Sequence, residues 1–517
     1  MRLIAADGVV GQPWDSNLAV NKSLFPGSCR AASKSFSPRF AKSAVAFATM
    51  KSLLLLSLIP PFALAIWPAP SSSSLGNSTL WIDDDVTISY NGPNKVGYMH
   101  IQTSPIQYAP PAATDAPLTQ ASSYSSYGNS TNGSGASYTG SVIQAAISRT
   151  SQTLFQQNFI PWKFHPRNSN FEPPTSSKSF IQSITLQQQS PDPANITSPI
   201  AGQVDESYSI QVTASGEVTI TANSSYGIVH GLTTFTQLFY QHSAGGVYTP
   251  YAPVSISDAP TFLHRGLNMD LSRNWFAVTD IKRMIDAMAY NKFNRMHLHI
   301  TDAQSWPLQV PSLPALAAQG AYRADLSYTP SQIQDIQYYG AIQGVEVYLE
   351  IDSPGHTSSI AYAYPDLIAS FNIQPNWDDY AAEPPSGTLK LNSTAVYDFM
   401  NTLYSDVLPR VRPLSVYFHT GGDEVNQNAY LNDDTVRSND TSVLQPLIQK
   451  FVDRNHDQIR ANGMIPMVWE EMLLTWNLTL GSDVIVQTWM SDQSVVSTTA
   501  LGHYALAGNY EYWVSNL

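Results

Sequence analysis

The sequence predicts an α/β fold: a (β/α)8 TIM-type barrel that lacks its last strand and helix, preceded by an α+β domain. From about residue 263 onward, strand-like apolar segments alternate with helical segments, which is typical of a parallel sheet covered by helices on both faces. Polar and aromatic residues gather at the carboxyl ends of these strands, where such a barrel places its active site. A doubly wound sheet would alternate similarly, but no Gly-x-Gly-x-x-Gly motif follows the first strand.

The first 65 residues have the pattern of a targeting segment. Residues 50–65 begin with a basic residue, continue with an apolar run too short to span a membrane, and end in Ala63-Leu64-Ala65, a small-x-small cleavage site. We therefore interpret residues 50–65 as a secretory signal peptide and residues 1–49 as an upstream extension that is not native. The alternative is a mitochondrial transit peptide, because residues 1–49 contain Arg, Lys and Ser with few acids.

Residues 66–252 read as the α+β domain. Period-two alternation predicts strands at 86–90, 208–212 and 218–222. Apolar residues at helical spacing predict a helix over about 227–240. A tract rich in Ser, Gly, Asn and Tyr at 118–141 predicts a loop, and 253–260 reads as the linker to the next domain.

Residues 253–517 are expected to form the barrel. Helices are expected at 278–291 and 441–462, among others. Because the chain stops just after the seventh predicted strand, we expect the barrel to be truncated at its C-terminus. The seven predicted strands are 263–271, 294–301, 344–352, 415–422, 465–470, 483–489 and 504–512.

The amino-acid composition excludes several classes of function. The net charge of −13, from 26 basic and 39 acidic residues, argues against a nucleic-acid partner. A single cysteine, Cys29, excludes a disulfide scaffold and a cysteine-ligated metal site, and we predict no metal, no cofactor and no membrane partner. Eight glycosylation sequons support secretion. They begin at Asn77, Asn129, Asn132, Asn195, Asn223, Asn392, Asn439 and Asn477.

The segment Gly421-Gly422-Asp423-Glu424, at the end of a predicted strand, is the clearest chemical motif. Neighbouring residues on a regular strand point to opposite faces, but the glycines let the backbone turn so that both acids reach one pocket. Two crowded carboxylates do not both ionise easily, so one becomes a proton donor near neutral pH. The alternative is a helix N-terminus with acids stabilised by its dipole. The position at the end of a barrel strand favours the catalytic interpretation.

At these motifs the sequence resembles glycoside hydrolase family 20, the β-N-acetylhexosaminidases, and is most similar to fungal secreted members. The resemblance covers roughly residues 253–517 strongly and 66–252 more loosely. The motifs that carry it are His264-Arg265-Gly266 with Asp270 and Arg273, His297-x-His299-x-x-Asp302, Asp352-Ser353-Pro354-Gly355-His356-Thr357, and His419-x-Gly421-Gly422-Asp423-Glu424.

The resemblance implies substrate-assisted retaining catalysis, an exception to the usual scheme of two facing carboxylates. Glu424 is then the general acid, and Asp423 orients the 2-acetamido group that attacks the anomeric carbon. Asp302 and His356 correspond to a buried pair that tunes the proton affinity of the acid.

Further residues are implied as sugar ligands. Arg265 would hold ring hydroxyls, Trp469 and Trp489 would line the sugar pocket, and Tyr512 would hydrogen-bond the acetamido oxygen. Asp270 and Arg273 form a candidate structural pair.

The sequence thus predicts a secreted exo-β-N-acetylhexosaminidase acting on terminal N-acetylglucosamine or N-acetylgalactosamine of chitooligosaccharides or glycans. The resemblance also allows a homodimer. The alternative is a catalytically inactive truncated fragment or a sugar-binding protein.

Overall fold

The structure is a computed structural model. The predicted signal peptide, the upstream extension and Tyr512 lie outside the described residues. The structure describes residues 66–508 apart from 94, 101–113, 118–134, 158 and 162–164.

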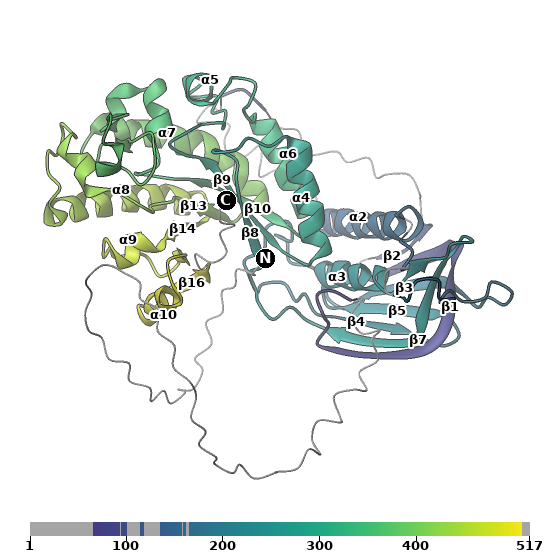
Figure 1. The fold of residues 1–517 in the computed structure, drawn as a ribbon. Helices are drawn as coiled ribbons and strands as arrows, with labels where there is room; N and C mark the ends of the chain where they lie inside the picture. Colours follow the sequence, from purple (N-terminus) through teal and green to yellow (C-terminus); the bar gives the residue numbers. More distant parts are fainter. Residues whose placement is uncertain are drawn as a thin grey trace, which may run out of the picture. The chain divides into compact units, whose positions relative to one another are not determined.

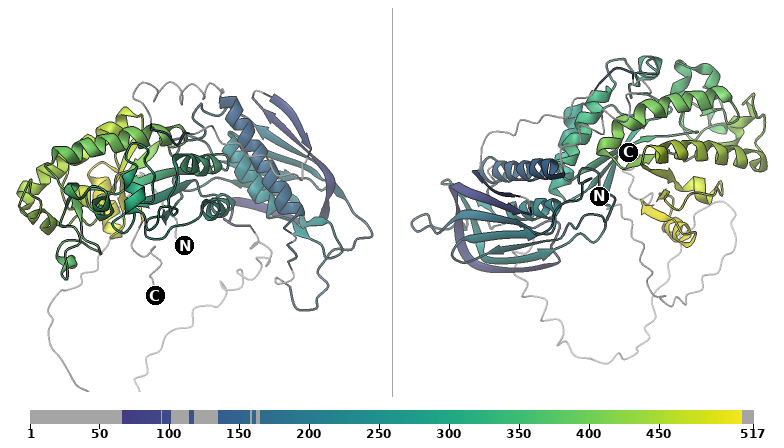
Figure 2. Two further views of the ribbon diagram at one scale, coloured as in Figure 1. Left: turned by 90° about the horizontal axis from the view of Figure 1, so that it is seen from above. Right: turned by 180° about the vertical axis from the view of Figure 1, so that it is seen from behind.

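The N-terminal part is built on a seven-stranded mixed sheet. Its strand order is β2-β1-β3-β5-β4-β7-β6, and β1 also pairs with β7. Two helices, α2 (Gly135–Phe155) and α3 (Ser225–Thr236), lie along one face of the sheet (Figures 1 and 2). The strands are β1 (Ser72–Gly92), β2 (Lys95–His100), β3 (Phe180–Gln188), β4 (Tyr208–Val212), β5 (Glu217–Ala222), β6 (Tyr240–Gln241) and β7 (Val247–Asp258).

Three local predictions for this part are wrong in their extent. The helix predicted to reach 240 ends at Thr236, because Tyr240 begins strand β6. Most of the predicted linker is strand β7, in which buried Val254 and Ile256 alternate with exposed serines and pair with β1 and β4. Residues 135–141, predicted as loop, belong to α2.

The second part contains the predicted parallel sheet. Its order is β16-β15-β14-β13-β10-β9-β8, and every adjacent pair is parallel. The seven-strand prediction is therefore confirmed, and among the described residues β8 and β16 are the sheet edges. The strands are β8 (Gly266–Asp270), β9 (Arg295–Thr301), β10 (Glu346–Ile351), β13 (Tyr417–His419), β14 (Ile465–Trp469), β15 (Ile485–Thr488) and β16 (Tyr504–Ala507).

Helices cover the outer face of this curled sheet (Figures 1 and 2). The larger ones are α4 (Val278–Tyr290), α6 (Pro330–Ala341), α7 (Thr394–Val411) and α8 (Thr441–Ala461), so the predictions at 278–291 and 441–462 are confirmed. The smaller elements are α5 (Ala315–Gly320), η3 (Ser358–Tyr362), η4 (Pro365–Leu367), β11 (Ile368–Ala369), η5 (Trp377–Asp379), β12 (Thr388–Leu389), η6 (Arg412–Leu414), η7 (Gln427–Leu431), α9 (Glu470–Leu474) and α10 (Asp492–Ala500).

The sheet separates two kinds of side chain. Alternate strand residues such as Leu298, Leu349 and Phe418 pack into the apolar core shared with the helices. The residues between them point to the other face, which is polar and aromatic, because successive side chains on a strand alternate. Glu350 and His419 on that face are both fully buried. The concave face of the sheet therefore carries side chains that can bind a ligand or transfer protons.

None of the helices in the described part of the chain is long and apolar enough to cross a membrane.

Phe418 tests the apolar side of the sheet. Its ring is fully buried and meets the ring of Tyr404 edge-on at 5.6 Å. Phe418→Ala leaves a cavity, so we expect a loss of about 3–5 kcal/mol in the free energy of unfolding, measured by urea denaturation. Val496→Ala on exposed α10 is the control, for which we expect a change within about 0.5 kcal/mol. Equal effects of the two substitutions would contradict the assigned core.

Candidate active site

The carboxylates Asp423 and Glu424 are presented by a tight turn after strand β13. Gly421 and Gly422 have φ angles of +72° and +103°, which glycine adopts without strain. A Cβ atom at Gly421 would lie 1.8 Å from Oδ1 of Asp352, and the Gly422 N–H donates to that oxygen at 2.8 Å. The two glycines therefore let the chain turn directly against Asp352, as the motif predicts.

His356 lies between this turn and a buried aspartate. Its Nε2 is 3.4 Å from Glu424 Oε2 and 3.8 Å from Asp423 Oδ1, while its Nδ1 is 3.0 Å from Asp302 Oδ1. Burial opposes a charge on the ring, but the surrounding carboxylates outweigh burial and raise the pKa of His356 well above its ordinary value. The structure thus brings together Glu424, Asp423, His356 and Asp302.

Asp352 and Asp423 form a hydrogen-bonded pair of carboxyl groups. Burial and the proximity of Asp423 raise the pKa of Asp352 well above its ordinary value. Burial also raises the pKa of Asp423, although the imidazolium of His356 and the hydrogen bond from Asp352 work against it. We place the shared proton on Asp352, so that Asp423 accepts the hydrogen bond.

Asp302 is fully buried and surrounded by cationic groups. Besides His356, it contacts His299 Nε2 at 2.6 Å and an Arg273 amino group at 2.9 Å. Burial alone would raise the pKa of Asp302, but His356 and His299 hold it well below its ordinary value. Arg273 also pairs with Asp270 at 2.9 Å and with Glu383. The predicted Asp270–Arg273 pair exists, and it belongs to this larger cluster.

Arg265 is not at this site, and its expected position beside the sugar is corrected. It precedes the first residue of β8 and so lies at the amino end of that strand. Its guanidinium donates to Glu206 at 2.6 and 3.1 Å, and its remaining donors reach the carbonyl oxygens of Phe262 and Lys292. Arg273 follows the carboxyl end of the same strand, so it is the arginine available to a ligand.

The two predicted tryptophans differ in their surroundings. Trp469 is 3% exposed, and its indole N–H donates to Glu350 at 2.7 Å inside the barrel. Trp489 is half-buried and donates its indole N–H to Glu471 Oε1 at 3.1 Å. Burial, reinforced by the charge of Asp423, raises the pKa of Glu471 to about 8. Trp489 therefore stands beside a carboxyl group that is protonated near neutral pH.

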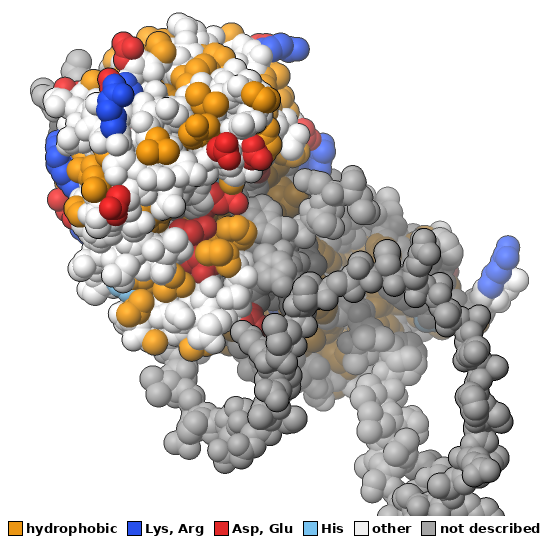
Figure 3. Space-filling view, turned by 60° about the vertical axis from the view of Figure 1, so that its left-hand side comes forward, with side chains coloured by type: hydrophobic (Ala, Val, Ile, Leu, Met, Phe, Trp, Pro, Cys, Tyr) orange, Lys and Arg blue, Asp and Glu red, His pale blue; other side chains and the backbone are white. Residues whose placement is uncertain are grey.

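The carboxylates open onto a hollow. Glu424, His356 and Glu383 line a cavity of about 20 Å³ together with loop residues such as Tyr380. Acidic side chains also lie in the indentation of the face seen in Figure 3. A larger cavity of about 740 Å³ lies among α2, α3, α4 and α6, but it is lined by none of the carboxylates of this turn. The titratable side chains at the smaller cavity, rather than the size of a cavity, therefore identify the site.

Several carboxylate and imidazole groups near the turn lie close enough together that they could in principle be metal ligands. In four groups within the described chain, the candidate ligand atoms lie within 4.8 Å of one another. Three of the groups combine two carboxylates with one imidazole, and the fourth combines Glu350 with the imidazoles of His297 and His419. Attraction between opposite charges accounts for the closeness, and we assign no metal.

Comparison with known proteins supplies the family. Residues 262–514 match the model of the glycosyl hydrolase family 20 catalytic domain, and residues 66–238 match the model described as beta-acetyl hexosaminidase like. The chain is 40% identical over 479 residues to a beta-hexosaminidase of Arthroderma benhamiae. The aligned region covers 87% of this chain and 75% of that protein. The chain belongs to glycosyl hydrolase family 20.

Other family 20 relatives are more distant. A chitooligosaccharidolytic beta-N-acetylglucosaminidase of Ostrinia furnacalis is 32% identical, over 60% of this chain and 55% of its own length. The crystal structure of Flavobacterium johnsoniae chitobiase superimposes with a TM-score of 0.61 at 25% identity, over 86% of this chain and 59% of that chain. The chain therefore spans less than two thirds of these two proteins. The structure of the Streptomyces coelicolor β-N-acetylhexosaminidase, 20% identical with a TM-score of 0.55, supports the fold.

Some residues of this family 20 site were missed from the sequence. Glu383 lies in a loop 110 residues after its partner Arg273, and no local pattern links them. His299 is part of a motif quoted above but was given no role, and Glu350 was not singled out, although a signal existed for both. Each lies two residues from another polar residue on its strand, Asp352 and His297 respectively, and that period marks a polar inner face.

The raised pKa of Glu471 predicts how the stability of the protein depends on pH. Its folded pKa of about 8 is above the ordinary value of 4.5, so its stabilising contribution is complete below pH 4.5 and is lost as pH rises through 8. Glu471→Gln mimics the neutral acid and removes this dependence. We expect similar melting temperatures for variant and wild type at pH 5. At pH 8.5 we expect a more stable variant, by up to about 5 kcal/mol at about 1.4 kcal/mol per pKa unit.

The matched control is Glu217→Gln, at an exposed position on β5. Its effect on the melting temperature should be small and equal at the two pH values. A Glu471→Gln variant whose difference from wild type does not change with pH would contradict a buried neutral carboxyl group.

Proposed function

We propose that this chain is an exo-acting β-N-acetylhexosaminidase that removes terminal non-reducing N-acetylglucosamine or N-acetylgalactosamine from chitooligosaccharides or glycans. One observation carries the proposal: adjacent carboxylates, Asp423 and Glu424, are held at the carboxyl end of a barrel strand by a histidine that is itself paired with buried Asp302. Family membership supports the same activity, and the named relatives act on or are named for such sugars.

In this proposal Glu424 is the general acid. Its side chain is 35% exposed, so a glycosidic oxygen can reach it. Glu424 donates its proton to that oxygen while the carbonyl oxygen of the sugar's 2-acetamido group attacks the anomeric carbon. The glycosidic C–O bond breaks, and the products are the leaving alcohol and an oxazolinium ion. Adjacent rather than facing acids suit this chemistry, because only one of them must reach the scissile bond.

The second step returns the enzyme to its starting state. The Glu424 carboxylate accepts a proton from water, and the water oxygen attacks the anomeric carbon as the oxazolinium ring opens. The configuration at the anomeric carbon is retained because it is inverted twice. Asp423 accepts the acetamido N–H and balances the positive charge that develops on it. Asp352, which carries the shared proton, favours the ionised form of Asp423.

The remaining contacts position the sugar. Arg273, which is 32% exposed, would donate to a sugar hydroxyl from the amino group that also contacts Asp270, while its other donors hold Glu383 and Asp302. Trp489 and Trp469 would face the apolar side of the sugar and the acetamido methyl. Tyr512 remains the proposed donor to the acetamido oxygen. We also propose that the protein is secreted after cleavage of residues 50–65, in keeping with the sequons.

Glu424→Gln tests the acid. We expect kcat on chitobiose to fall about 10²–10⁴-fold, the usual contribution of a general acid. On the nitrophenyl N-acetylglucosaminide the fall should be smaller, because nitrophenolate leaves without protonation. Nitrophenol release and sugar analysis measure the two rates, and Glu217→Gln is the exposed control. Full activity of Glu424→Gln on chitobiose would contradict the assignment, and an inactive, folded wild type would contradict the proposed function.

The two arginines that flank β8, Arg265 before it and Arg273 after it, form a matched pair. Arg273→Lys keeps the charge but loses the planar fork, so we expect kcat/KM to fall on the order of 10-fold with little change in stability. Arg265→Met takes from buried Glu206 its guanidinium partner and leaves only His230 to pair with it, so we expect a loss of about 3–5 kcal/mol in stability and an unchanged KM. Steady-state kinetics and thermal melts distinguish the two results. A raised KM in Arg265→Met would restore Arg265 as a sugar ligand.

A further inference from the structure

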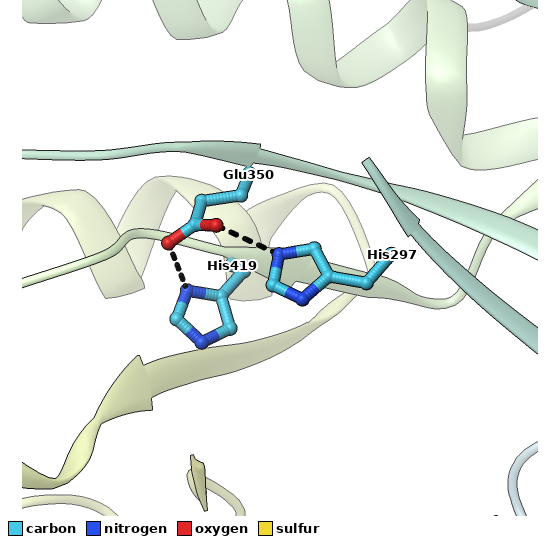
Figure 4. Close-up of side chains that lie close together, drawn as sticks. All are labelled: His297, Glu350 and His419. Atoms are coloured by element: carbon cyan, nitrogen blue, oxygen red, sulfur yellow. Dashed lines mark ion pairs between the residues drawn. The ribbon is translucent and has the colours of Figure 1, made fainter. Parts of the chain in front are cut away.

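Glu350, a fully buried carboxylate with no part in the proposed mechanism, sits at the centre of the barrel interior. Its Oε2 lies 2.8 Å from His297 Nε2 and 2.7 Å from His299 Nδ1. Its Oε1 lies 3.1 Å from His419 Nδ1 and accepts the indole N–H of Trp469 at 2.7 Å. Figure 4 shows the imidazoles of His297 and His419 pointing at the two oxygens from different strands. The Glu350 carboxylate thus contacts four side chains, which come from three strands.

His299 connects this carboxylate to the active site. Its Nδ1 faces Glu350 at 2.7 Å, and its Nε2 faces Asp302 at 2.6 Å. Burial opposes ionisation of Glu350 and of Asp302, but the neighbouring imidazoles outweigh burial and hold the pKa of both carboxyl groups well below its ordinary value. Both carboxyl groups are therefore ionised, and a ring nitrogen that faces either of them at this distance carries the proton. Both nitrogens are in that position, so His299 is an imidazolium. Burial opposes the charge, but Glu350 and Asp302 outweigh it and raise the pKa of His299 well above its ordinary value.

The contacts form one continuous row from the interior to the proposed acid. In order, the groups are Glu350, His299, Asp302, His356 and Glu424, with successive contacts of 2.7, 2.6, 3.0 and 3.4 Å. The first four alternate in charge, negative then positive. In an interior of low polarity, each charge in such a row depends on its neighbours.

We propose that Glu350 is a positioning residue for the reaction: it holds His299 as an imidazolium, which keeps Asp302 ionised and His356 fixed beside Glu424. The inference rests on the proposed function, because it assigns Glu350 to the same site. Glu350 itself does not reach the substrate, since it is fully buried and three side chains separate it from Glu424.

Removing the charge of Glu350 has a consequence of defined sign. In Glu350→Gln, His299 keeps only one carboxylate, so the pKa of its buried imidazolium falls. When His299 loses its proton, Asp302 loses a cationic partner and the row is broken. The defect therefore grows as pH rises. The other charged or titratable groups around the row are His297 on β9, His419 on β13, Asp352 after β10, Asp423 after β13, Arg273 after β8, and Glu383.

Glu346 offers a matched control on the same strand. It is 2% exposed, four residues before Glu350, and its Oε1 accepts from Val416 N–H at 2.7 Å and from Ser415 at 3.0 Å. It also lies 3.3 Å from the Arg295 guanidinium. It is therefore a similarly buried glutamate, and its described hydrogen bonds and ion pair involve neither His299 nor Asp302. Glu346→Gln reports the cost of changing a buried glutamate without touching the row.

The first experiment measures kcat/KM from pH 4 to 9 on methylumbelliferyl N-acetylglucosaminide, with the full chain. We expect Glu350→Gln to lower kcat/KM at least 10-fold at pH 7, with a deficit that grows with pH and shrinks below pH 5. Glu350→Asp, which keeps the charge, should recover the wild-type shape of the profile, and Glu346→Gln should leave that shape unchanged. A deficit independent of pH, or the same shift in Glu346→Gln, would overturn the inference.

The second experiment does not depend on catalytic activity. In protein labelled with ¹⁵N-histidine, the ring signals of His299, assigned by their loss in His299→Gln, should report an imidazolium from pH 5 to 8. In Glu350→Gln they should report a neutral ring within this range. A neutral His299 in the wild type, or an unchanged imidazolium in Glu350→Gln, would overturn the inference. A wild type inactive on the sugar would instead reject the proposed function, while these spectra still decide the role of Glu350.

Discussion

The pairing register of three parallel strands holds the site in place. In β9, β10 and β13, His299, Glu350 and His419 are directly opposite one another, so their side chains leave the sheet at the same level and on the same side. A slip by one residue would turn each of them to the apolar face covered by helices. The turn of Gly421 and Gly422 then continues from β13 at the same end of the sheet, which places Asp423 and Glu424 above this polar level.

The buried charges of this region stabilise one another. Isolated charges are costly to bury, but here carboxylates alternate with imidazoles and with Arg273, and each has an opposite neighbour within about the length of a hydrogen bond. Such a network is fixed when the protein folds, so the dipoles and charges around the proposed acid need little rearrangement during the reaction. It also means that loss of one member weakens the others, because an unpaired buried charge remains.

The two ends of strand β8 show a division of tasks. At the amino end, Arg265 pairs with Glu206, a residue from the preceding part of the chain, and is committed to holding the structure together. At the carboxyl end, Arg273 joins the acidic cluster of the site while remaining partly exposed. The separation follows the general rule for (β/α)8 barrels, in which the amino ends of strands contribute stability and the carboxyl ends contribute chemistry.

The features that depend on residues close together in the chain could be predicted from the amino-acid sequence alone. Alternating segments located all seven parallel strands, and the short motifs around Asp302, His356 and Asp423-Glu424 identified residues that the structure brings together. The tertiary structure decided the rest. Residues 253–258 look like a linker until β1 and β4 pair with them, and residues 135–141 look like a loop until they continue into α2.

The same distinction applies to the site. Only the assembled sheet places Arg265 at the wrong end of its strand for catalysis and joins Glu350 to imidazoles 53 residues before it and 69 residues after it. Local sequence reports which face a side chain prefers. It does not report which distant charge will meet that side chain, because electrostatic partners are chosen by strand register and burial, and both exist only once the chain is folded.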